Sequence, residues 1–206
     1  MDTRKYMVDI PEGESGEWRV KKYSVTPEEE CYQSLRCLFN PQRPARVVPA
    51  GDYTMLSHNG VCVMSDTPDE IQDHIIPIMR AKGHCLVAGL GLGLVVSAML
   101  DNPKVDKVTV LELSEDVIDL VGVHMDTIYG ERLEIIHTDA MTWKPPKDAY
   151  YEVAWFDIWN HIDEENLSDM ATIQRRYARK SEWKDCWQQN GCIAQRERIE
   201  SGRGWY

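Results

Sequence analysis

A glycine-rich loop is the first place in the chain where a ligand could bind. The run Gly89-Leu90-Gly91-Leu92-Gly93 follows an apolar segment typical of a strand and precedes one typical of a helix. Glycine lets the backbone turn sharply and approach a ligand closely, and the N-terminus of the following helix carries a partial positive charge. The same loop would also serve as a plain tight turn, so its meaning depends on the residues around it.

Three acids follow at the ends of successive predicted strands. Glu112 ends the next strand, 19 residues after Gly93, where an acid typically accepts hydrogen bonds from the ribose hydroxyls of a nucleotide. Asp139 follows the third strand and Asp157 ends the fourth. Because the carboxyl ends of parallel strands meet at one edge of a sheet, we expect the three carboxylates to line one crevice. Asp157 has an alternative role as the cap of a following helix.

Alternating strands and helices must hold these residues in place. Strands are predicted at 84–88, 107–113, 133–137 and 152–156, and helices at 94–100 and from 114 to about 125. This alternation favours a parallel sheet with helices on both faces. The predicted fold is therefore α/β, with a Rossmann-like parallel sheet.

A β-hairpin is predicted before this sheet. Asn59-Gly60 separates two apolar runs, 53–56 and 61–64, and this dipeptide supplies the positive φ angles of a tight turn. The residues before the hairpin, 1–45, are polar and are predicted to be loosely packed, with a short helix around 27–38.

A helix is predicted to link the hairpin to the sheet. Thr67 and Glu70 form the Thr-x-x-Glu pattern of a capping box, and Pro68 suits the first helical position. Gly83 is expected to end the element. Pro77 should kink it, because proline lacks the amide proton that a helix interior uses.

The last part of the chain is predicted to be helical. Only 49 residues follow Asp157; the apolar residues among 167–177 lie near one helical face, and Trp183 and Trp187 are one turn apart. Residues 190–206 show no strand pattern, so we predict a truncated sheet. The expected organisation is a polar lead-in (1–45), a hairpin with its linking helix (46–83), a nucleotide-binding Rossmann-like domain (84–162), and a helical, basic, Trp-rich tail packed on it (163–206).

Composition argues against several classes of protein. The net charge is −11 at pH 7, and residues 1–170 hold 15 basic against 30 acidic residues, whereas 171–206 hold eight basic residues, ending at Arg203, against four acids. An acidic body disfavours nonspecific binding to nucleic acid, which relies on cationic contacts to phosphate. No apolar run approaches the roughly 20 residues of a membrane-spanning helix. The six cysteines lack a close-spaced metal pattern, which favours reduced thiols in a cytoplasmic protein without a metal site.

The chain resembles class I S-adenosylmethionine-dependent enzymes, and among them the spermidine-synthase-like branch. Those enzymes share the G-x-G-x-G spacing of 89–93, whereas a nicotinamide fingerprint needs G-x-G-x-x-G and position 94 is leucine. Leu86–Gly93 is similar to the branch's first strand and loop, Val108–Ile118 to its second strand and helix, and Leu56–Gly60 to its hairpin lid. The resemblance covers about residues 53–160.

The resemblance implies a site for S-adenosylmethionine or S-adenosylhomocysteine. The glycine loop would pass under the methionine portion, Glu112 would hold the ribose hydroxyls, and Asp139 with the amide of Ala140 would read adenine. His74 falls near a cofactor-binding histidine of the family. The complete candidate cofactor-binding set is Gly89, Leu90, Gly91, Gly93, Glu112, Leu113, Asp139, Ala140 and His74.

Departures from that branch bear on the reaction. Met64 stands where aminopropyltransferases have a cofactor-binding glutamine. In Asp157-Ile158-Trp159-Asn160 the second of two expected acids is an amide, which neither neutralises an ammonium group nor accepts its proton. We therefore do not expect polyamine synthesis. No Asn/Asp-Pro-Pro-Tyr motif follows the fourth strand, so the usual signature for methylation of adenine or glutamine is missing.

The sequence thus predicts an S-adenosylmethionine-binding protein that acts as a methyltransferase on an unidentified acceptor. Asp157 is the candidate catalytic residue and would orient or deprotonate the acceptor, while Trp159 and Asn160 are candidates for the substrate pocket. Two alternatives stay open: aminopropyl transfer from the decarboxylated cofactor, and a non-catalytic binding or assembly protein on a degraded enzyme fold. The expected partners are a small-molecule cofactor and the acceptor, without a membrane or nucleic acid; homo-oligomer formation is left open.

Overall fold

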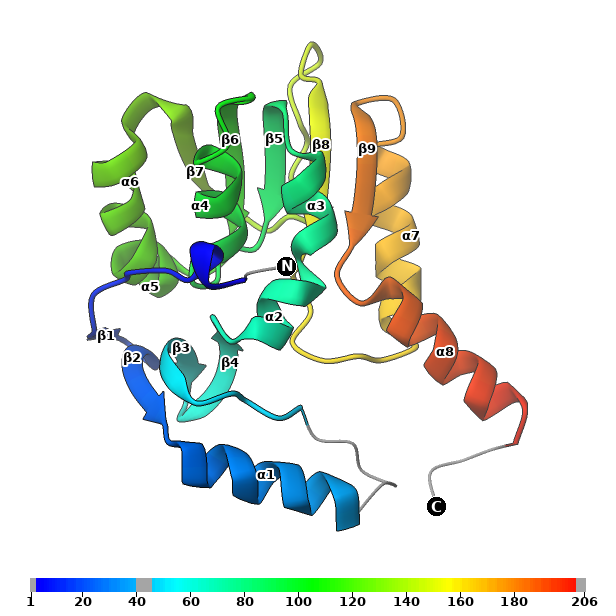
Figure 1. The fold of residues 1–206 in the computed structure, drawn as a ribbon. Coiled ribbons are helices and arrows are strands. Elements are labelled where there is room, and N and C mark those ends of the chain that lie inside the picture. Colours follow the sequence, from blue (N-terminus) through cyan, green and yellow to red (C-terminus); the bar gives the residue numbers. More distant parts are fainter. Residues whose placement is uncertain (1–2, 40–45, 203–206) are drawn as a thin grey trace.

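Two β-sheets form the framework of the chain in a computed structural model that describes residues 3–39 and 46–202 (Figure 1). The antiparallel sheet has the order β1-β2-β3-β4, and the parallel sheet has the order β7-β6-β5-β8-β9. The antiparallel strands are β1 (Gly13–Ser15), β2 (Trp18–Val25), β3 (Gly51–His58) and β4 (Val61–Ser65). The parallel strands are β5 (Gly83–Ala88), β6 (Val105–Glu112), β7 (Leu133–His137), β8 (Tyr151–Phe156) and β9 (Ser181–Cys186).

Helices connect and cover these strands. They are η1 (Arg4–Tyr6), α1 (Pro27–Phe39), α2 (Pro68–Asp73), α3 (Ile75–Arg80), α4 (Leu94–Leu100), α5 (Glu115–Val117), the π-helical turn η2 (Ile118–Gly122), α6 (Val123–Tyr129), η3 (Gly130–Arg132), α7 (Asn166–Arg176) and α8 (Gln189–Glu200). None of the helices within 3–39 and 46–202 is long and apolar enough to cross a membrane. Arg203, the last basic residue of the predicted tail, lies outside the described residues.

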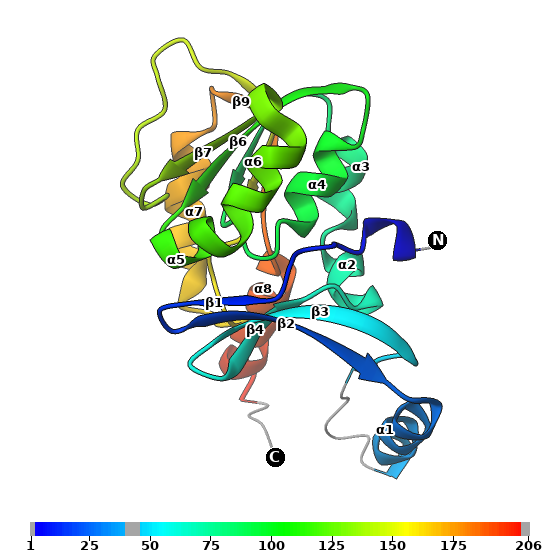
Figure 2. The ribbon, with the colours of Figure 1, turned by 90° about the vertical axis from the view of Figure 1, so that its left-hand side faces the viewer.

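Strand β5 is buried on both faces, as its continuous apolar run predicts. Cys85 and Val87 belong to the core that includes α3, α4 and α6, whereas Leu86 and Ala88 belong to the core that includes α7. Each of the four is at most 1% exposed. Successive side chains of a strand point to opposite faces, so this alternation places helices on both sides of the sheet (Figure 2). The predicted Rossmann-like α/β sheet is confirmed.

The order of the parallel strands reverses between β5 and β8. From β5 the chain moves outward to β6 and β7 and then crosses back to β8 and β9, while β5 pairs in parallel with both β6 and β8. The loops that follow β5 and β8 therefore lead away from each other and leave a crevice at the carboxyl edge of the sheet. The antiparallel sheet lies across this edge (Figure 2).

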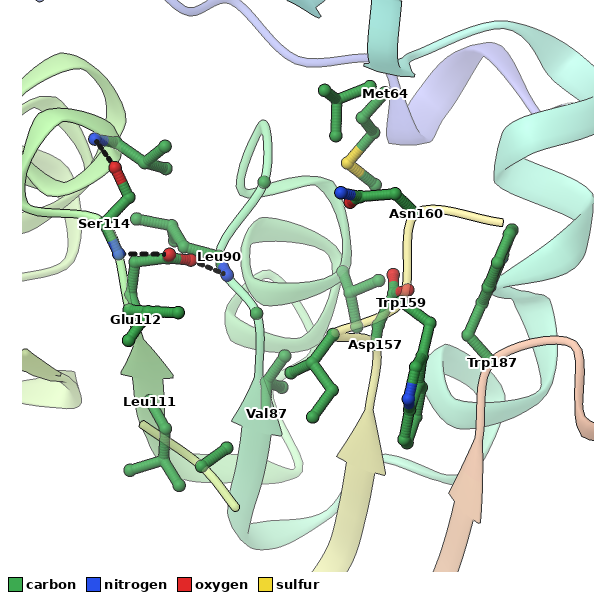
Figure 3. A pocket seen from close by; sticks show the side chains of 18 of the residues that line it. Met64, Val87, Leu90, Leu111, Glu112, Ser114, Asp157, Trp159, Asn160 and Trp187 are labelled. Atoms are coloured by element: carbon green, nitrogen blue, oxygen red, sulfur yellow. Dashed lines mark hydrogen bonds between the residues drawn. The ribbon is translucent and has the colours of Figure 1, made fainter. Parts of the chain in front are cut away.

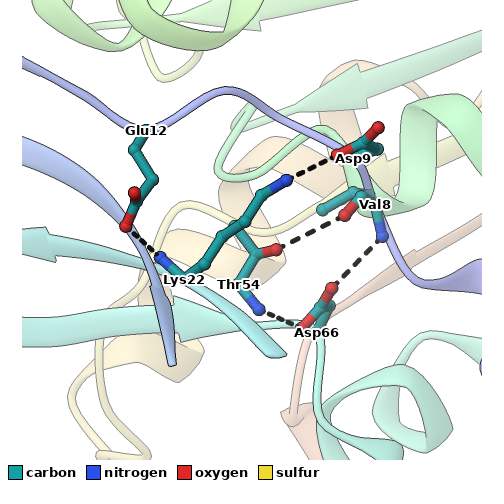
Figure 4. Close-up of polar contacts among 6 residues, drawn as sticks. All are labelled: Val8, Asp9, Glu12, Lys22, Thr54 and Asp66. Carbon is teal, nitrogen blue, oxygen red and sulfur yellow. Dashed lines mark hydrogen bonds and ion pairs between the residues drawn. The ribbon is translucent and has the colours of Figure 1, made fainter. Parts of the chain in front are cut away.

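The N-terminal segment is not loosely packed, and that prediction is wrong. β2 pairs with β3 along all eight of its residues, so β1 and β2 extend the predicted hairpin of β3 and β4 into a four-stranded sheet. Asp66, 1% exposed, accepts hydrogen bonds from the backbone N–H groups of Val8 (3.2 Å) and Thr54 (2.7 Å), and Lys22 pairs with Asp9 at 2.6 Å (Figure 4). The short helix predicted in this segment is present as α1.

The linking helix forms in two pieces, α2 and α3, separated at His74. The ring of Pro77 would collide with the carbonyl group four residues earlier, that of Asp73, so the helix is interrupted there rather than gently kinked. The expected capping box does not form. Thr67 is the N-cap residue, but its hydroxyl lies 3.1 Å from that of Ser65 and makes no capping hydrogen bond.

Strand β9 contradicts the prediction of an all-helical tail. The segment Ser181–Cys186 pairs in parallel with β8 and forms an edge of the sheet; Trp183 lies within it and Trp187 directly after it, so these tryptophans are not one helical turn apart. An edge strand has one neighbour and tolerates charged side chains, which is why Ser-Glu-Trp-Lys-Asp-Cys lacks an apolar run. The helical prediction is confirmed for α7 and α8.

Candidate functional site

A pocket of about 470 Å³ lies where the two sheets meet, within the usual range of roughly 300–1,000 Å³ for small-molecule sites (Figure 3). The antiparallel sheet contributes Trp18, Leu56, Val63 and Met64, and the loops after the parallel strands form the opposite wall. The pocket brings together ten of the twelve predicted site residues: Gly89, Leu90, Gly91, Glu112, Leu113, Asp139, Ala140, Asp157, Trp159 and Asn160. His74 and Gly93 do not line it.

The glycines of the loop are required by the protein's own packing. Gly89 has a φ of 92° and Gly91 a φ of 52°, values that residues with a Cβ rarely adopt. A Cβ at Gly89 would collide with the carbonyl oxygen of Asp157, and one at Gly91 would collide with the sulfur of Met64. Gly93 faces Met125 on the far side of the loop. The glycines therefore do not by themselves indicate a ligand.

Most N–H groups of the loop 89–93 are already bound by the protein. That of Leu90 donates to Oε2 of Glu112 (2.7 Å), and that of Leu92 donates to the sulfur of Met64 (3.4 Å). The first and third glycines donate to backbone carbonyl oxygens. Within the described residues, the N–H of Gly91 is the only one of the five without an acceptor.

The carboxylate of Glu112 is fixed in place at the end of β6. Besides the bond from Leu90, its Oε1 accepts a hydrogen bond from the N–H of Ser114 (2.8 Å), and the residue is 9% exposed. Each carboxylate oxygen has a second lone pair, so both can still accept a hydroxyl hydrogen bond from a ligand. Leu113, 68% exposed, lies beside it on the pocket wall. Ser114 caps α5 as predicted, accepting from the N–H of Val117.

The turn after β7 is clamped by an arginine from α7. Oδ1 of Asp139 accepts a hydrogen bond from the N–H of Met141 (2.7 Å), which fixes the carboxylate at the pocket. The guanidinium of Arg176 donates to the carbonyl oxygens of Ala140 (2.9 Å), Met141 and Trp143 (3.1 Å). The predicted basic face of the tail thus has a structural task at this position. No local sequence pattern predicts this contact, because Arg176 and the turn are more than 30 residues apart.

Asp157 and His74 form a close pair at the inner end of the pocket. Nε2 of His74 lies 3.6 Å from Oδ2 of Asp157, and both ring nitrogens are buried without a hydrogen-bond partner among the described residues. Burial, with repulsion from Glu70 and Asp73, raises the pKa of Asp157 to about 8. Burial lowers the pKa of His74 to about 4. His74 therefore contacts the candidate catalytic residue rather than the pocket itself.

Several lining residues were not expected from the sequence. Glu70 and Asp169 add two carboxyls, and burial together with repulsion from Asp73 raises the pKa of Glu70 to about 7. Trp155 and Trp187 also line the pocket, and their buried indole N–H groups have no acceptor within the described ranges. The sequence predicts a capping box for Glu70 and packing of the tail for Trp187, because their place at the pocket depends on contacts between distant elements.

Comparisons with known proteins find partial matches to solved structures at low identity. No protein-family model matches the chain, and a search of curated proteins finds no match. Similar solved structures include a dimethyladenosine transferase from Plasmodium falciparum (TM-score 0.37, 22% identity), the 23S rRNA methyltransferase ErmE (0.44, 18%) and the mitomycin 7-O-methyltransferase MmcR (0.41, 18%).

These alignments are partial on both sides. They cover 45%, 56% and 53% of this chain, and 32%, 44% and 32% of the three methyltransferases, respectively. The aligned part of the chain therefore spans less than half the length of each of these proteins.

Proposed function

We propose that the chain binds S-adenosylmethionine or S-adenosylhomocysteine in this pocket and transfers a methyl group to an acceptor. The observation that carries the proposal is the carboxylate of Glu112, which two backbone N–H groups fix at the end of β6 with a lone pair left on each oxygen. A carboxylate held in this way is a suitable acceptor for two neighbouring ribose hydroxyls.

The remaining polar groups fit the other parts of the cofactor. The N–H of Ala140 has no acceptor among the described residues and, with the carboxylate of Asp139, can form hydrogen bonds with the edge of an adenine. The unpaired N–H of Gly91 can bind the methionine portion. The volume of about 470 Å³ accommodates a nucleoside with a short side chain.

The chain's own part in the reaction is to bind, orient and exclude water. When bound, the cofactor supplies an electrophilic methyl group on a sulfonium ion. Apolar side chains from both sheets enclose the pocket, and alignment of the acceptor in such an enclosure accounts for much of the rate. Asp157, protonated at neutral pH, can donate a hydrogen bond to the acceptor and accepts a proton once it is ionised.

Titration calorimetry tests the proposal. We expect wild-type protein to bind S-adenosylmethionine, and Glu112→Ala to lose about 1.5–3 kcal/mol, or roughly ten- to a hundredfold in affinity. Glu115→Ala is the matched control, because Glu115 is exposed on the following helix and does not line the pocket. Unchanged affinity in a folded Glu112→Ala variant would contradict the assignment.

The same titration separates the alternatives. Clear preference for the decarboxylated cofactor would favour aminopropyl transfer. If protein that circular dichroism shows to be folded binds neither S-adenosylmethionine, nor S-adenosylhomocysteine, nor the decarboxylated cofactor, that result would favour a non-catalytic role.

A further inference from the structure

The charged groups that line the pocket are all acids. Within the described residues they are the carboxyls of Glu70, Glu112, Asp139, Asp157 and Asp169, and no lysine, arginine or histidine side chain is among the lining residues. A lining of this kind produces a negative potential inside an enclosed space, where water screens it less than at an open surface. Ligands that carry a net positive charge are therefore favoured.

Two of these acids are not compensated by the protein. Glu112 accepts two backbone hydrogen bonds and Asp139 accepts one, whereas Glu70 and Asp157 receive none from any residue the structure describes. The nearest imidazole to Asp157, that of His74, is buried and neutral at pH 7.

Arg46 offsets only part of the negative charge around these two acids. Its guanidinium pairs with Asp73 at 2.7 Å and lowers the pKa of Glu70, whereas Asp73 and Asp69 raise it. Trp159 and Trp187 lie beside Asp157 and Asn160 (Figure 3), and indole faces are good partners for a cation.

We propose that the pocket selects its ligand by positive charge: it binds a sulfonium ligand in preference to the neutral thioether of the same shape, and the Glu70–Asp157 pair releases a proton as the cation binds. The inference rests on the function proposed above and specifies how that site distinguishes the methyl donor from its demethylated product. S-adenosylmethionine carries one net positive charge at neutral pH, and S-adenosylhomocysteine carries none.

The proton release follows from the states of the two acids. Burial, with repulsion from Glu70 and Asp73, raises the pKa of Asp157 to about 8. Burial, with repulsion from Asp73 and Asp69, raises the pKa of Glu70 to about 7, so at pH 7 the two acids hold protons that free carboxyls would have lost. A cation in the pocket stabilises the ionised carboxylate. One carboxyl O–H bond then breaks, its electrons stay on the carboxylate oxygen, and the proton passes to the buffer.

Calorimetric titrations of the wild-type chain at pH 7 test this. The ligands are S-adenosylmethionine, S-adenosylhomocysteine and sinefungin, in which an amine that is protonated at pH 7 replaces the sulfonium, and each is titrated in phosphate and in Tris buffer. We expect the two cationic ligands to bind at least about tenfold more tightly than the thioether. The buffer dependence of the heat should show release of about half to one proton for the cations and little for the thioether.

A variant localises the effect. Glu70→Gln keeps the shape of the side chain and removes its charge, so the ratio of the two affinities should fall several-fold. Glu131→Gln, the same change at an exposed residue of η3 that does not line the pocket, should leave the ratio unchanged.

Two results would overturn the inference, and they differ. Equal or tighter binding of the thioether, without buffer dependence, refutes charge selection while the proposed function stands. If none of the three ligands binds, both the charge selection and the proposed function are refuted.

Discussion

Nε2 of His74 lies 3.6 Å from Oδ2 of Asp157, yet at neutral pH the two side chains do not form an ion pair. Burial raises the pKa of the carboxyl to about 8 and lowers the pKa of the imidazole to about 4, so the proton stays on Asp157 and His74 is neutral. His74 is buried and Asp157 is largely buried, with 21% of its side chain exposed, so a pair without charge avoids the cost of desolvating two ions. The helix break at His74 places the ring where this contact is made.

The free energy of unfolding should therefore fall as the pH rises from about 6.5 to about 8. In this window the folded protein binds a proton on Asp157 that the unfolded chain, with a pKa near 3.8, has already lost. Glu70, with a raised pKa of about 7, acts in the same direction, and the lowered pKa of His74 opposes it only below about 6.5. Urea denaturation at the two pH values should show a loss of about 1–2 kcal/mol.

The control for this pH dependence is Asp157→Asn, which removes the group with the largest pKa shift. Its unfolding free energy should change less between pH 6.5 and 8 than that of the wild type. A wild-type stability that rises across the window would contradict the assigned protonation states.

Gly91→Ala should destabilise the protein more than Gly60→Ala does. Gly91 has a φ of 52°, and a Cβ there would collide with the sulfur of Met64. Gly60 also has a positive φ, of 77°, but has open space around it, so Gly60→Ala should cost only the backbone strain of about 1–2 kcal/mol. The collision should add about 1–3 kcal/mol, measured by denaturation.

A second substitution tests where the extra cost of Gly91→Ala comes from. Adding Met64→Ala to it should recover part of that cost, and no recovery would show that the contact with Met64 is not its source.

Arg176→Ala should loosen the turn that holds Asp139 and Ala140. The three carbonyl oxygens bound by the guanidinium lose a charged donor, and we expect a loss of about 2–3 kcal/mol in unfolding free energy together with weaker binding of the proposed cofactor. The matched control is Arg175→Ala, because Arg175 is exposed and bonds only within its own helix. Equal effects of the two changes would contradict the clamp.

Asp66→Ala should release the N-terminal segment from the antiparallel sheet. The N–H groups of Val8 and Thr54 would lose their acceptor, and an unpaired buried donor costs about 1–3 kcal/mol. Limited proteolysis should then cleave near residue 8 faster than in the wild type. Asp9→Ala removes only a solvent-exposed ion pair with Lys22 and should leave both the stability and the cleavage rate close to those of the wild type.

The parts of the fold that could be predicted are those with a local pattern. Strands β5, β6 and β8 have apolar runs because they lie inside the sheet, and the edge strand β7 has a shorter one. The hairpin turn at Asn59-Gly60 follows from the positive φ of both residues. The edge strand β9 and the half-exposed β2 have no such run. Their pairing depends on a neighbouring strand far away in the sequence, so neither was predicted.

The residues of the candidate site also fall into those that a local pattern predicts and those that it does not. Glu112, Asp139 and Asp157 could be placed from the sequence because each follows a strand with a clear pattern, and all three line the pocket. Glu70 and Trp187 reach the pocket through packing between distant elements, and no spacing in the sequence reveals that they line it.

The pocket has walls from two separate sheets, and this has a consequence for how the molecule melts. Met64 belongs to the antiparallel sheet and Gly91 to the loop after β5, and both line the pocket, so a bound ligand would touch both layers. Such a ligand links the unfolding of one layer to that of the other, because opening either layer destroys the site. Calorimetric unfolding should therefore become sharper on ligand binding, with hydrogen exchange slowed in β3 and β4 as well as in β5 and β8. The β3–β4 hairpin and the parallel sheet would then unfold together as one cooperative unit.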